Sequence, residues 1–269
     1  MAVNPLFQRL SIITGPEMLD RLRQTHVMIF GLGGVGSWCA EALVRSGVGK
    51  ISIVDSDTIC ITNVNRQVQA TSRTLGAFKA DTLKERLLEI NPQCQVASFC
   101  KVFSKENAEL FDFDNVDFVI DAIDSLSHKL DLIELCSRLK LTFFSSMGMA
   151  QKLDPTRIKT ADIWETSGCP LARLVRQGLR KRGFQGHFTA VYSDESLPLR
   201  VSAADIPCGS AQCLCPARNR ADPDAAVEWC SSKKIINGSA VTVTAAAGMI
   251  LASLALRSMY EAPGESALE

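Results

Sequence analysis

Short apolar runs alternate with longer segments of helical periodicity through the first 150 residues. The short runs predict β-strands and the longer segments predict α-helices. Strands are expected at 27–30, 50–55, 95–99, 116–120 and 141–145, and helices at 34–46, 79–90 and 125–139. Strands and helices that alternate in this way form βαβ units with right-handed crossovers. We therefore expect a Rossmann-like α/β fold, with a mostly parallel sheet that a mixed or antiparallel part extends toward the C-terminus.

Two segments of the C-terminal half differ from this pattern. Segment 193–224 has four prolines and weak periodicity, which predicts a long loop that is functional or disordered. Segment 235–256 carries no charged residue and approaches the ~20 apolar residues that span a bilayer. Small and hydroxyl residues interrupt it, however. We therefore expect a helix buried in an α/β layer, with a membrane-associated segment as the alternative.

Composition narrows the class of protein. The chain has 269 residues, 46% of them hydrophobic and 22% charged, which is enough for a large core in one domain or two small ones. The formal net charge is zero, so a nucleic-acid partner would have to be held by a local basic patch. Ten cysteines without a secretory signal pattern favour a reducing compartment. The cytoplasm is the expected location.

A glycine-rich turn joins the first predicted strand to the first long helix. Gly31, Gly33 and Gly36 occupy the three positions of a GxGxxG pattern, which lets the backbone approach a phosphate at a helix N-terminus. Ser37 is an additional candidate donor to that phosphate. Asp55 ends the next strand and is placed to accept hydrogen bonds from a ribose. With these residues alone, a redox enzyme that uses NAD remains an alternative.

Further polar residues favour a triphosphate over NAD. The cluster 62–67, Lys79 and the segment 121–125 have no role in a plain dehydrogenase. Arg66 and Lys79 could neutralise phosphate oxygens, and Asp124, just beyond a strand, could hold Mg²⁺ with water and phosphate. A solvated loop arginine, a surface lysine and an N-cap aspartate are the structural alternatives. Each alternative is reasonable singly, but the ordered set makes all three together improbable.

These motifs resemble the adenylating core of the ubiquitin-activating-type superfamily over roughly the first 150 residues. The matching patterns are Gly31-Leu-Gly-Gly-Val-Gly36, Asp55-x-Asp57, Asn63-x-Asn65-Arg66-Gln67, Gly76-x-x-Lys79 and Asp121-Ala-Ile-Asp124. The resemblance implies ATP and Mg²⁺ as cofactors, homodimers, and a substrate carboxylate that attacks the α-phosphate of ATP. It also implies that Arg66, Lys79 and Asp124 act at the phosphates. The implied nucleotide-binding residues are Gly31, Gly33, Gly34, Gly36, Asp55, Asp57, Thr62, Asn63, Asn65, Arg66, Lys79, Asp124 and Ser125, together with Arg9 reaching across a dimer.

Downstream segments separate the branches of this superfamily. Segments 154–158, 170–176 and 191–195 are similar to those of the tRNA threonylcarbamoyladenosine dehydratases, and the chain has no CxxC pair of the kind that bacterial activators of sulfur-carrier proteins generally carry. The resemblance implies one domain over 1–269, with a nucleotide-binding core at about 20–150 and a substrate or dimer part at about 151–260.

The implied reaction is ATP-dependent dehydration of the modified adenosine in tRNA to its cyclic form. Adenylation of the C-terminal glycine of a ubiquitin-like sulfur carrier is the alternative within the superfamily, and a non-catalytic adaptor that binds ATP is another. The resemblance implies tRNA as the substrate-bearing partner, and a sulfur-relay or cysteine-desulfurase protein is a candidate partner.

The cysteines near the C-terminus are a separate question. Cys230 resembles the candidate catalytic cysteine of the dehydratases, although several extra residues separate it from Gly238. Ring closure can proceed without a thiol, and an isolated cysteine is commonly a small hydrophobe. Together with Cys230, Cys208, Cys213 and Cys215 form no recognised zinc pattern. We therefore expect free thiols there, with Cys230 kept as a candidate only.

A cluster of cations offers a candidate RNA contact. Five cations fall within ten residues of a predicted helix, namely Arg173, Arg176, Arg180, Lys181 and Arg182. Such charges could follow a phosphate backbone and would make binding sensitive to salt. A solvated helix face explains them equally well.

Overall fold

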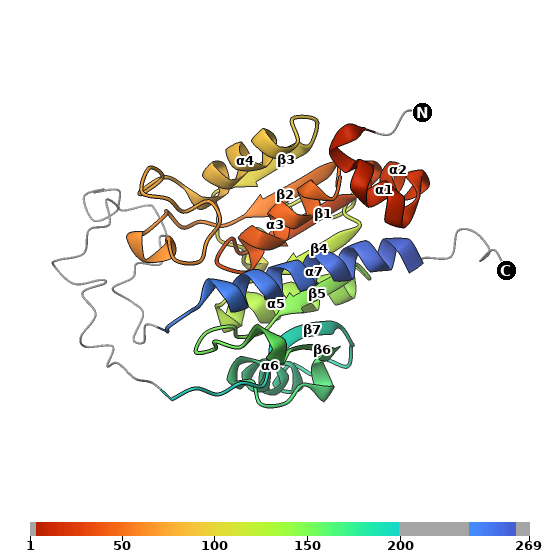
Figure 1. Ribbon diagram of the computed structural model, residues 1–269. Coiled ribbons are helices and arrows are strands. Elements are labelled where there is room, and N and C mark those ends of the chain that lie inside the picture. Colours follow the sequence, from red (N-terminus) through yellow and green to blue (C-terminus); the bar gives the residue numbers. More distant parts are fainter. Residues whose placement is uncertain (1–3, 199–236, 262–269) are drawn as a thin grey trace.

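The computed structural model describes residues 4–198 and 237–261 and is built on one seven-stranded sheet (Figure 1). The strand order is β3-β2-β1-β4-β5-β7-β6, and every pair is parallel except β6 with β7. The strands are β1 (His26–Phe30), β2 (Lys50–Val54), β3 (Gln95–Phe99), β4 (Phe118–Asp121), β5 (Thr142–Ser146), β6 (Ile158–Asp162) and β7 (Thr189–Ser193). The predicted parallel sheet, its antiparallel extension and all five predicted strands are confirmed. Residues 199–224 of the predicted loop lie outside the described residues.

Helices cover both faces of this sheet. They are α1 (Gln8–Thr14), α2 (Pro16–Gln24), α3 (Gly36–Arg45), α4 (Lys79–Ile90), α5 (Leu126–Arg138), α6 (Pro170–Lys181) and α7 (Val241–Glu261). Short 3-10 helices lie at Pro5–Phe7, Ile61–Asn63, Lys105–Leu110, Pro155–Arg157 and Ile163–Glu165. α3, α4 and α7 pack on one face of the sheet, and α5 and α6 pack on the other. The predicted helices at 34–46, 79–90 and 125–139 are confirmed.

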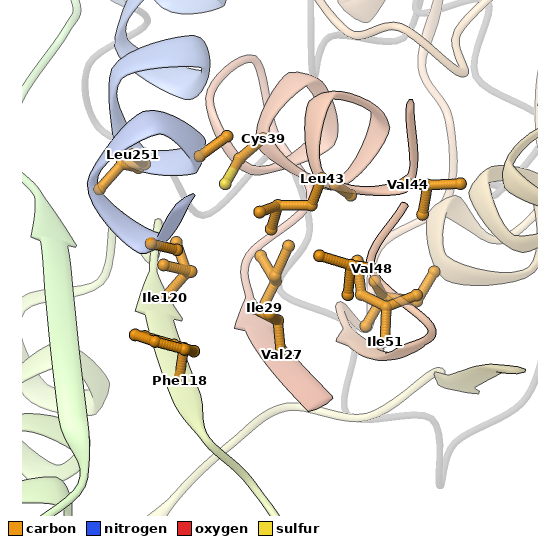
Figure 2. Close-up of a cluster of buried hydrophobic side chains, with 14 of the residues drawn as sticks. Val27, Ile29, Cys39, Leu43, Val44, Val48, Ile51, Phe118, Ile120 and Leu251 are labelled. Atoms are coloured by element: carbon orange, nitrogen blue, oxygen red, sulfur yellow. The ribbon is translucent and has the colours of Figure 1, made fainter. Parts of the chain in front are cut away.

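Alternation along β1 explains the two halves of the core. All five residues of β1 are buried, as expected for a central parallel strand. Val27 and Ile29 point toward Leu43 of α3 in Figure 2, whereas Met28 and Phe30 join the cluster under α5 and α6. The side-chain period of two along a strand therefore divides one apolar run between two cores.

The last helix, α7, packs by one face only. Its buried side chains include Val243, Ala247 and Leu251, and a Cβ at Gly248 would stand 2.5 Å from the carbonyl oxygen of Val35. On the outer side Met249 is 43% exposed. The prediction of a buried helix is therefore right for its inner face. By length and composition alone α7 is long and apolar enough to cross a membrane, with a mean hydropathy of 1.5.

Candidate active site

The glycine turn lies at the carboxyl end of β1, next to the loop that follows β4. Gly31 has a φ of +87°, and a Cβ there would stand 2.6 Å from the carbonyl oxygen of Ala122. A Cβ at Gly36 would stand 1.8 Å from the carbonyl oxygen of Gly31. At Gly33 a Cβ would meet nothing within 4 Å. Gly31 and Gly36 are thus required by packing, and Gly33 leaves backbone open to an approaching phosphate.

Gly34, inside the turn, and Ser37, just after it, contact other parts of the chain. A Cβ at Gly34 would stand 3.0 Å from the side chain of Thr244 on α7 and 3.2 Å from Cγ of Arg66. The Ser37 hydroxyl is fully buried and donates to the carbonyl oxygen of Gly33 at 2.7 Å. It also accepts from the backbone N–H of Val68 at 3.3 Å. The expectation that Ser37 donates to a phosphate is wrong, because its only hydroxyl proton is used in the hydrogen bond to Gly33 and the side chain is buried.

Asp55 follows β2 and is tied to the turn by backbone donors. Its Oδ2 accepts from the N–H of Leu32 at 2.7 Å, and its Oδ1 accepts from the N–H of Asp57 at 2.9 Å. Burial raises the pKa of Asp55, while the Lys79 ammonium and these two donors oppose that rise. A carboxylate has about four lone-pair sites, so Asp55 keeps acceptor capacity for the hydroxyls of a ribose.

Lys79 begins α4 beside both aspartates. Its Nζ lies 2.6 Å from Oδ2 of Asp57 and 3.8 Å from Oδ1 of Asp55. Backbone pairing of Thr58 with Phe78 brings the two ends of the intervening loop together. Burial acts to lower the pKa of Lys79, but the two carboxylates outweigh it and the pKa is raised. The site therefore holds a permanent ammonium, suited to phosphate oxygens.

Arg66 is held by its own loop. Its Nη1 donates to the carbonyl oxygen of Thr62 at 2.8 Å and to Oδ1 of Asn65 at 3.0 Å. Asn65 in turn donates from Nδ2 to the carbonyl oxygen of Ser239 at 2.9 Å. Asn63 is buried, and its Oδ1 accepts from the N–H of Cys60 at 3.0 Å. Asn63 and Asn65 thus shape the loop that presents Arg66, and Thr62 is exposed on it.

Asp124 and Ser125 lie on the loop after β4. Burial lowers the pKa of Arg66, while the Asp124 charge opposes that change and also acts to raise the pKa of Lys79. Asp124 is therefore close enough to both cations to interact with them. Ser125 precedes α5 and is half-buried, with its hydroxyl 3.3 Å from that of Ser127. The structure thus brings together the glycine turn, Asp55, Lys79, Arg66 and the Asp124 loop at one edge of the sheet.

The donor set of this edge can be tested against a metal. Among residues 4–198 and 237–261, no group of three or more His, Cys, Asp or Glu side chains could hold an ion. Mg²⁺ commonly takes only one or two protein carboxylates and completes its shell with water and phosphate oxygens. The exposed Asp124 carboxylate fits that requirement.

Comparison with protein families decides the relationship of this chain. The model of the ThiF family matches residues 7–268, almost the whole length. The chain belongs to the ThiF family. The resemblance inferred from the five motifs is thereby confirmed.

Relatives of known name place this ThiF chain within the family. It is 44% identical to the tRNA threonylcarbamoyladenosine dehydratase of Bacillus subtilis over 190 residues, which is 71% of this chain and 75% of that protein. It is 32% identical to the dehydratase of the same name from Escherichia coli over 252 residues, covering 91% and 90% of the two chains. The crystal structure of the E. coli dehydratase in complex with ATP superposes with a TM-score of 0.78 and 30% identity, covering 96% and 97% of the chains.

Some predicted residues of the ThiF chain are not brought to this site. Arg9 is exposed on α1. Phe7, two residues earlier, packs against Gly47 at the amino end of the sheet. Figure 1 shows α1 and α2 at the opposite end of the sheet from the loop that follows β2. Arg9 does not reach the site of its own chain, so its role across a dimer stays a prediction. Cys208, Cys213, Cys215 and Cys230 lie outside the described residues.

The five candidate RNA-binding cations are divided among different environments. They lie on α6 or at its end, as predicted. Arg176 donates to the hydroxyl of Thr166, Arg180 lies over the ring of Trp164 at 5.4 Å from its centroid, and Arg182 is 2.7 Å from Asp131 and 2.9 Å from Glu134. Arg176 is half-buried, and the other four cations, Arg173, Arg180, Lys181 and Arg182, are exposed. Within the described residues, Arg180 and Arg182 have a ring or carboxylate partner, whereas Arg173 and Lys181 have neither an ion pair nor a ring contact.

Several residues around the ThiF site were not found from the sequence. The indole of Trp38 donates to the carbonyl oxygen of Arg66 at 2.9 Å, and Thr244 of α7 lies against Gly34. Lys129 is fully buried and pairs with Asp121 at 2.5 Å. In the sequence, Lys129 is an ordinary lysine within a predicted helix, and nothing marks it as buried, because surface helices carry many lysines.

Proposed function

We propose that this chain dehydrates threonylcarbamoyladenosine in tRNA to its cyclic form and uses ATP to do so. The observation that carries the proposal is the match to the E. coli dehydratase across nearly the whole of both chains. The site supports it, because two cations and an exposed carboxylate stand beside an open glycine turn. A redox enzyme that uses NAD would leave Lys79 and Arg66 without a role.

The reaction has two steps that balance without a covalent enzyme intermediate. The threonyl carboxylate attacks the α-phosphorus of ATP, which forms a carboxyl–phosphate bond and releases pyrophosphate. The carbamoyl oxygen then attacks the activated carboxyl carbon, a proton leaves the carbamoyl nitrogen, and AMP departs with the carboxylate oxygen. Because nucleophile and electrophile belong to one side chain, proximity lowers the second barrier. The sum is the loss of one water from the nucleoside.

Each site residue has a role in this sequence. Asp55 orients the ribose of ATP through its remaining acceptor capacity. The ammonium of Lys79 and the guanidinium of Arg66 stabilise charge on the phosphate oxygens as the carboxylate attacks. Asp124 would hold Mg²⁺, and a bound Mg²⁺ would neutralise phosphate charge. We expect no thiol to be needed, and Cys230 stays a candidate only.

The decisive measurement is the mass of the modified nucleoside. Incubation with ATP, Mg²⁺ and tRNA that carries threonylcarbamoyladenosine should yield AMP and a nucleoside lighter by one water. An Arg66→Ala variant should bind tRNA but form little product, and unchanged activity would remove the role of Arg66. An unchanged nucleoside mass with protein that binds ATP would contradict the proposal. Pyrophosphate exchange that needs a ubiquitin-like protein and ignores tRNA would favour sulfur-carrier adenylation instead.

We also propose a cytoplasmic homodimer in which Arg9 serves the site of the second copy. The support is the position of Arg9 far from its own site, next to Ile12 and Ile13, which are 75% and 78% exposed. Light scattering measures the dimer, and a strictly monomeric active enzyme would contradict it. A sulfur-relay or cysteine-desulfurase partner stays a prediction without a structural argument.

A further inference from the structure

A fully buried ion pair lies beneath the loop that carries Asp124. Lys129 of α5 and Asp121 at the end of β4 both have 0% exposed side chains, and their Nζ and Oδ2 atoms are 2.5 Å apart. The hydroxyl of Ser145 on β5 donates to the same Oδ2 at 2.6 Å. The pair therefore joins three elements at the carboxyl edge of the sheet.

Every polar atom of this pair has a partner. Besides Asp121, Nζ of Lys129 donates to Oγ of Ser145 at 3.3 Å and to the carbonyl oxygen of Ser146 at 3.0 Å. Oδ1 of Asp121 accepts from the N–H of Ile123 at 2.9 Å. Burying two charges costs several kcal/mol per ion, and well-packed apolar residues are often at least as stabilising. Stability alone is thus a weak explanation for this pair.

The position of the pair is more informative than its energy. Asp121 is paired in register with Phe30, the last residue of β1, and the N–H of Ala122 donates to the carbonyl oxygen of Phe30 at 2.8 Å. Ala122 is also the residue against which Gly31 packs. The hydrogen bond from Ile123 to Asp121 then fixes the turn that leads to Asp124. The buried pair therefore stands where the glycine turn meets the Asp124 loop.

We propose that Lys129 and Asp121 are positioning residues for Asp124 and set the rate of the adenylation step. The pair holds the turn at Ile123, and so keeps the Asp124 carboxylate beside Arg66 and Lys79. This inference rests on the proposed function, and wild-type protein in the same assay tests that function separately.

The test removes both charges together. Asp121→Asn with Lys129→Met leaves no unpaired buried charge, so its melting temperature should lie above that of Lys129→Met alone. We expect kcat for pyrophosphate release to fall on the order of 10-fold to 100-fold, with KM for ATP changed less than threefold. Recovery of wild-type kcat in this folded double variant would overturn the proposal.

Combination with Asp124→Asn tests the route of the effect. If the pair acts through Asp124, adding the double substitution to Asp124→Asn should lower kcat no further. Multiplication of the two losses would overturn the proposed route. Should the double variant fail to fold, Ser145→Ala removes one partner of Asp121 without exposing a charge. Ser145→Ala should lower kcat by a smaller factor than the roughly 10-fold to 100-fold expected of the double variant, and an unchanged kcat would overturn the proposal.

A second buried carboxylate provides the matched control. Glu41 of α3 has a 5% exposed side chain and pairs, on the other face of the sheet, with Arg45 at 2.9 Å and with the 38% exposed Arg86 of α4 at 2.6 Å. Glu41→Gln with Arg86→Met should alter the melting temperature and leave kcat unchanged. A loss of kcat as large as that of the Lys129 variants would show that loss of any buried carboxylate and its cation has this effect, and would overturn the specific role.

Discussion

Two regions of the molecule contain clusters of polar residues that stand out in the sequence. The fold brings the side chains together in one region and separates them in the other. At the carboxyl edge of the sheet the motif residues converge, with Lys79 between two aspartates and the Asp124 charge acting on the pKa of Arg66. Along α6 and just past its end, one cation is half-buried and four are exposed, of which one stacks on a ring, one pairs with carboxylates and two do neither. Spacing relative to strand ends therefore predicts a site, whereas charge density along one helix predicts only a set of surface residues.

The largest expected effect concerns the two kinds of glycine in the turn. In Gly36→Ala the new Cβ would overlap the carbonyl oxygen of Gly31 at 1.8 Å, so we expect destabilisation at or above the roughly 1–3 kcal/mol of overpacking. Gly33→Ala has open space at its Cβ and should unfold at the same urea concentration as wild type. Its ATP affinity should fall on the order of tenfold, or about 1.4 kcal/mol. Equal urea midpoints for both variants would contradict this division.

The next effect separates Lys79 from another lysine of α4. Lys79→Met removes the ammonium that faces the phosphates, so kcat should fall on the order of 100-fold or more. Lys84→Met lies on the same helix, where Lys84 is half-buried outside the site, and should change kcat little. Steady-state pyrophosphate release at saturating ATP measures both. If the two variants lose the same activity, the site does not depend on the position of Lys79.

The smallest effect tests the α6 cations. Arg173→Ala with Lys181→Ala should raise KM for tRNA a few-fold. The plot of log binding constant against log salt concentration for tRNA should also become shallower, by somewhat less than one unit of slope for each phosphate that the variant no longer neutralises. Arg182→Ala breaks the ion pairs with Asp131 and Glu134, so it should lower thermal stability and leave the salt slope unchanged. Filter binding across a salt series, beside melting curves, measures both. A steeper loss of tRNA affinity in Arg182→Ala would reverse the assignment.

The sequence predicts the central sheet well for physical reasons. Each central strand is an apolar run buried on both faces, and each of the helices between them carries one apolar stripe, so periodicity identifies both. Asp55 and Lys79 could be assigned because parallel strands end at one edge of the sheet. The contact between Asp55 and Lys79 follows from the β-bridge between Thr58 and Phe78. No local sequence pattern predicts that bridge.

Other features depend on contacts between distant segments. Ser37 was expected to donate to a ligand, but the nearest acceptor is the carbonyl oxygen of Gly33 one turn earlier. Lys129 has the sequence context of a surface lysine, and only its place under β4 and β5 makes it buried. The exposed face of α7 could likewise not be predicted, because its sequence carries no charged residues up to position 256 and hydropathy alone does not say which side of a helix packs on the sheet.

Contacts made by α7 and by the residues just before it have a consequence for the order in which the chain is made. Thr244 lies against Gly34, and Asn65 reaches Ser239, 174 positions later. A ribosome releases the glycine turn long before it has synthesised the helix that supports it. Until Ser239 and Thr244 have been synthesised, the glycine turn and the Arg66 loop lack these two contacts, so we expect weaker nucleotide binding before that point.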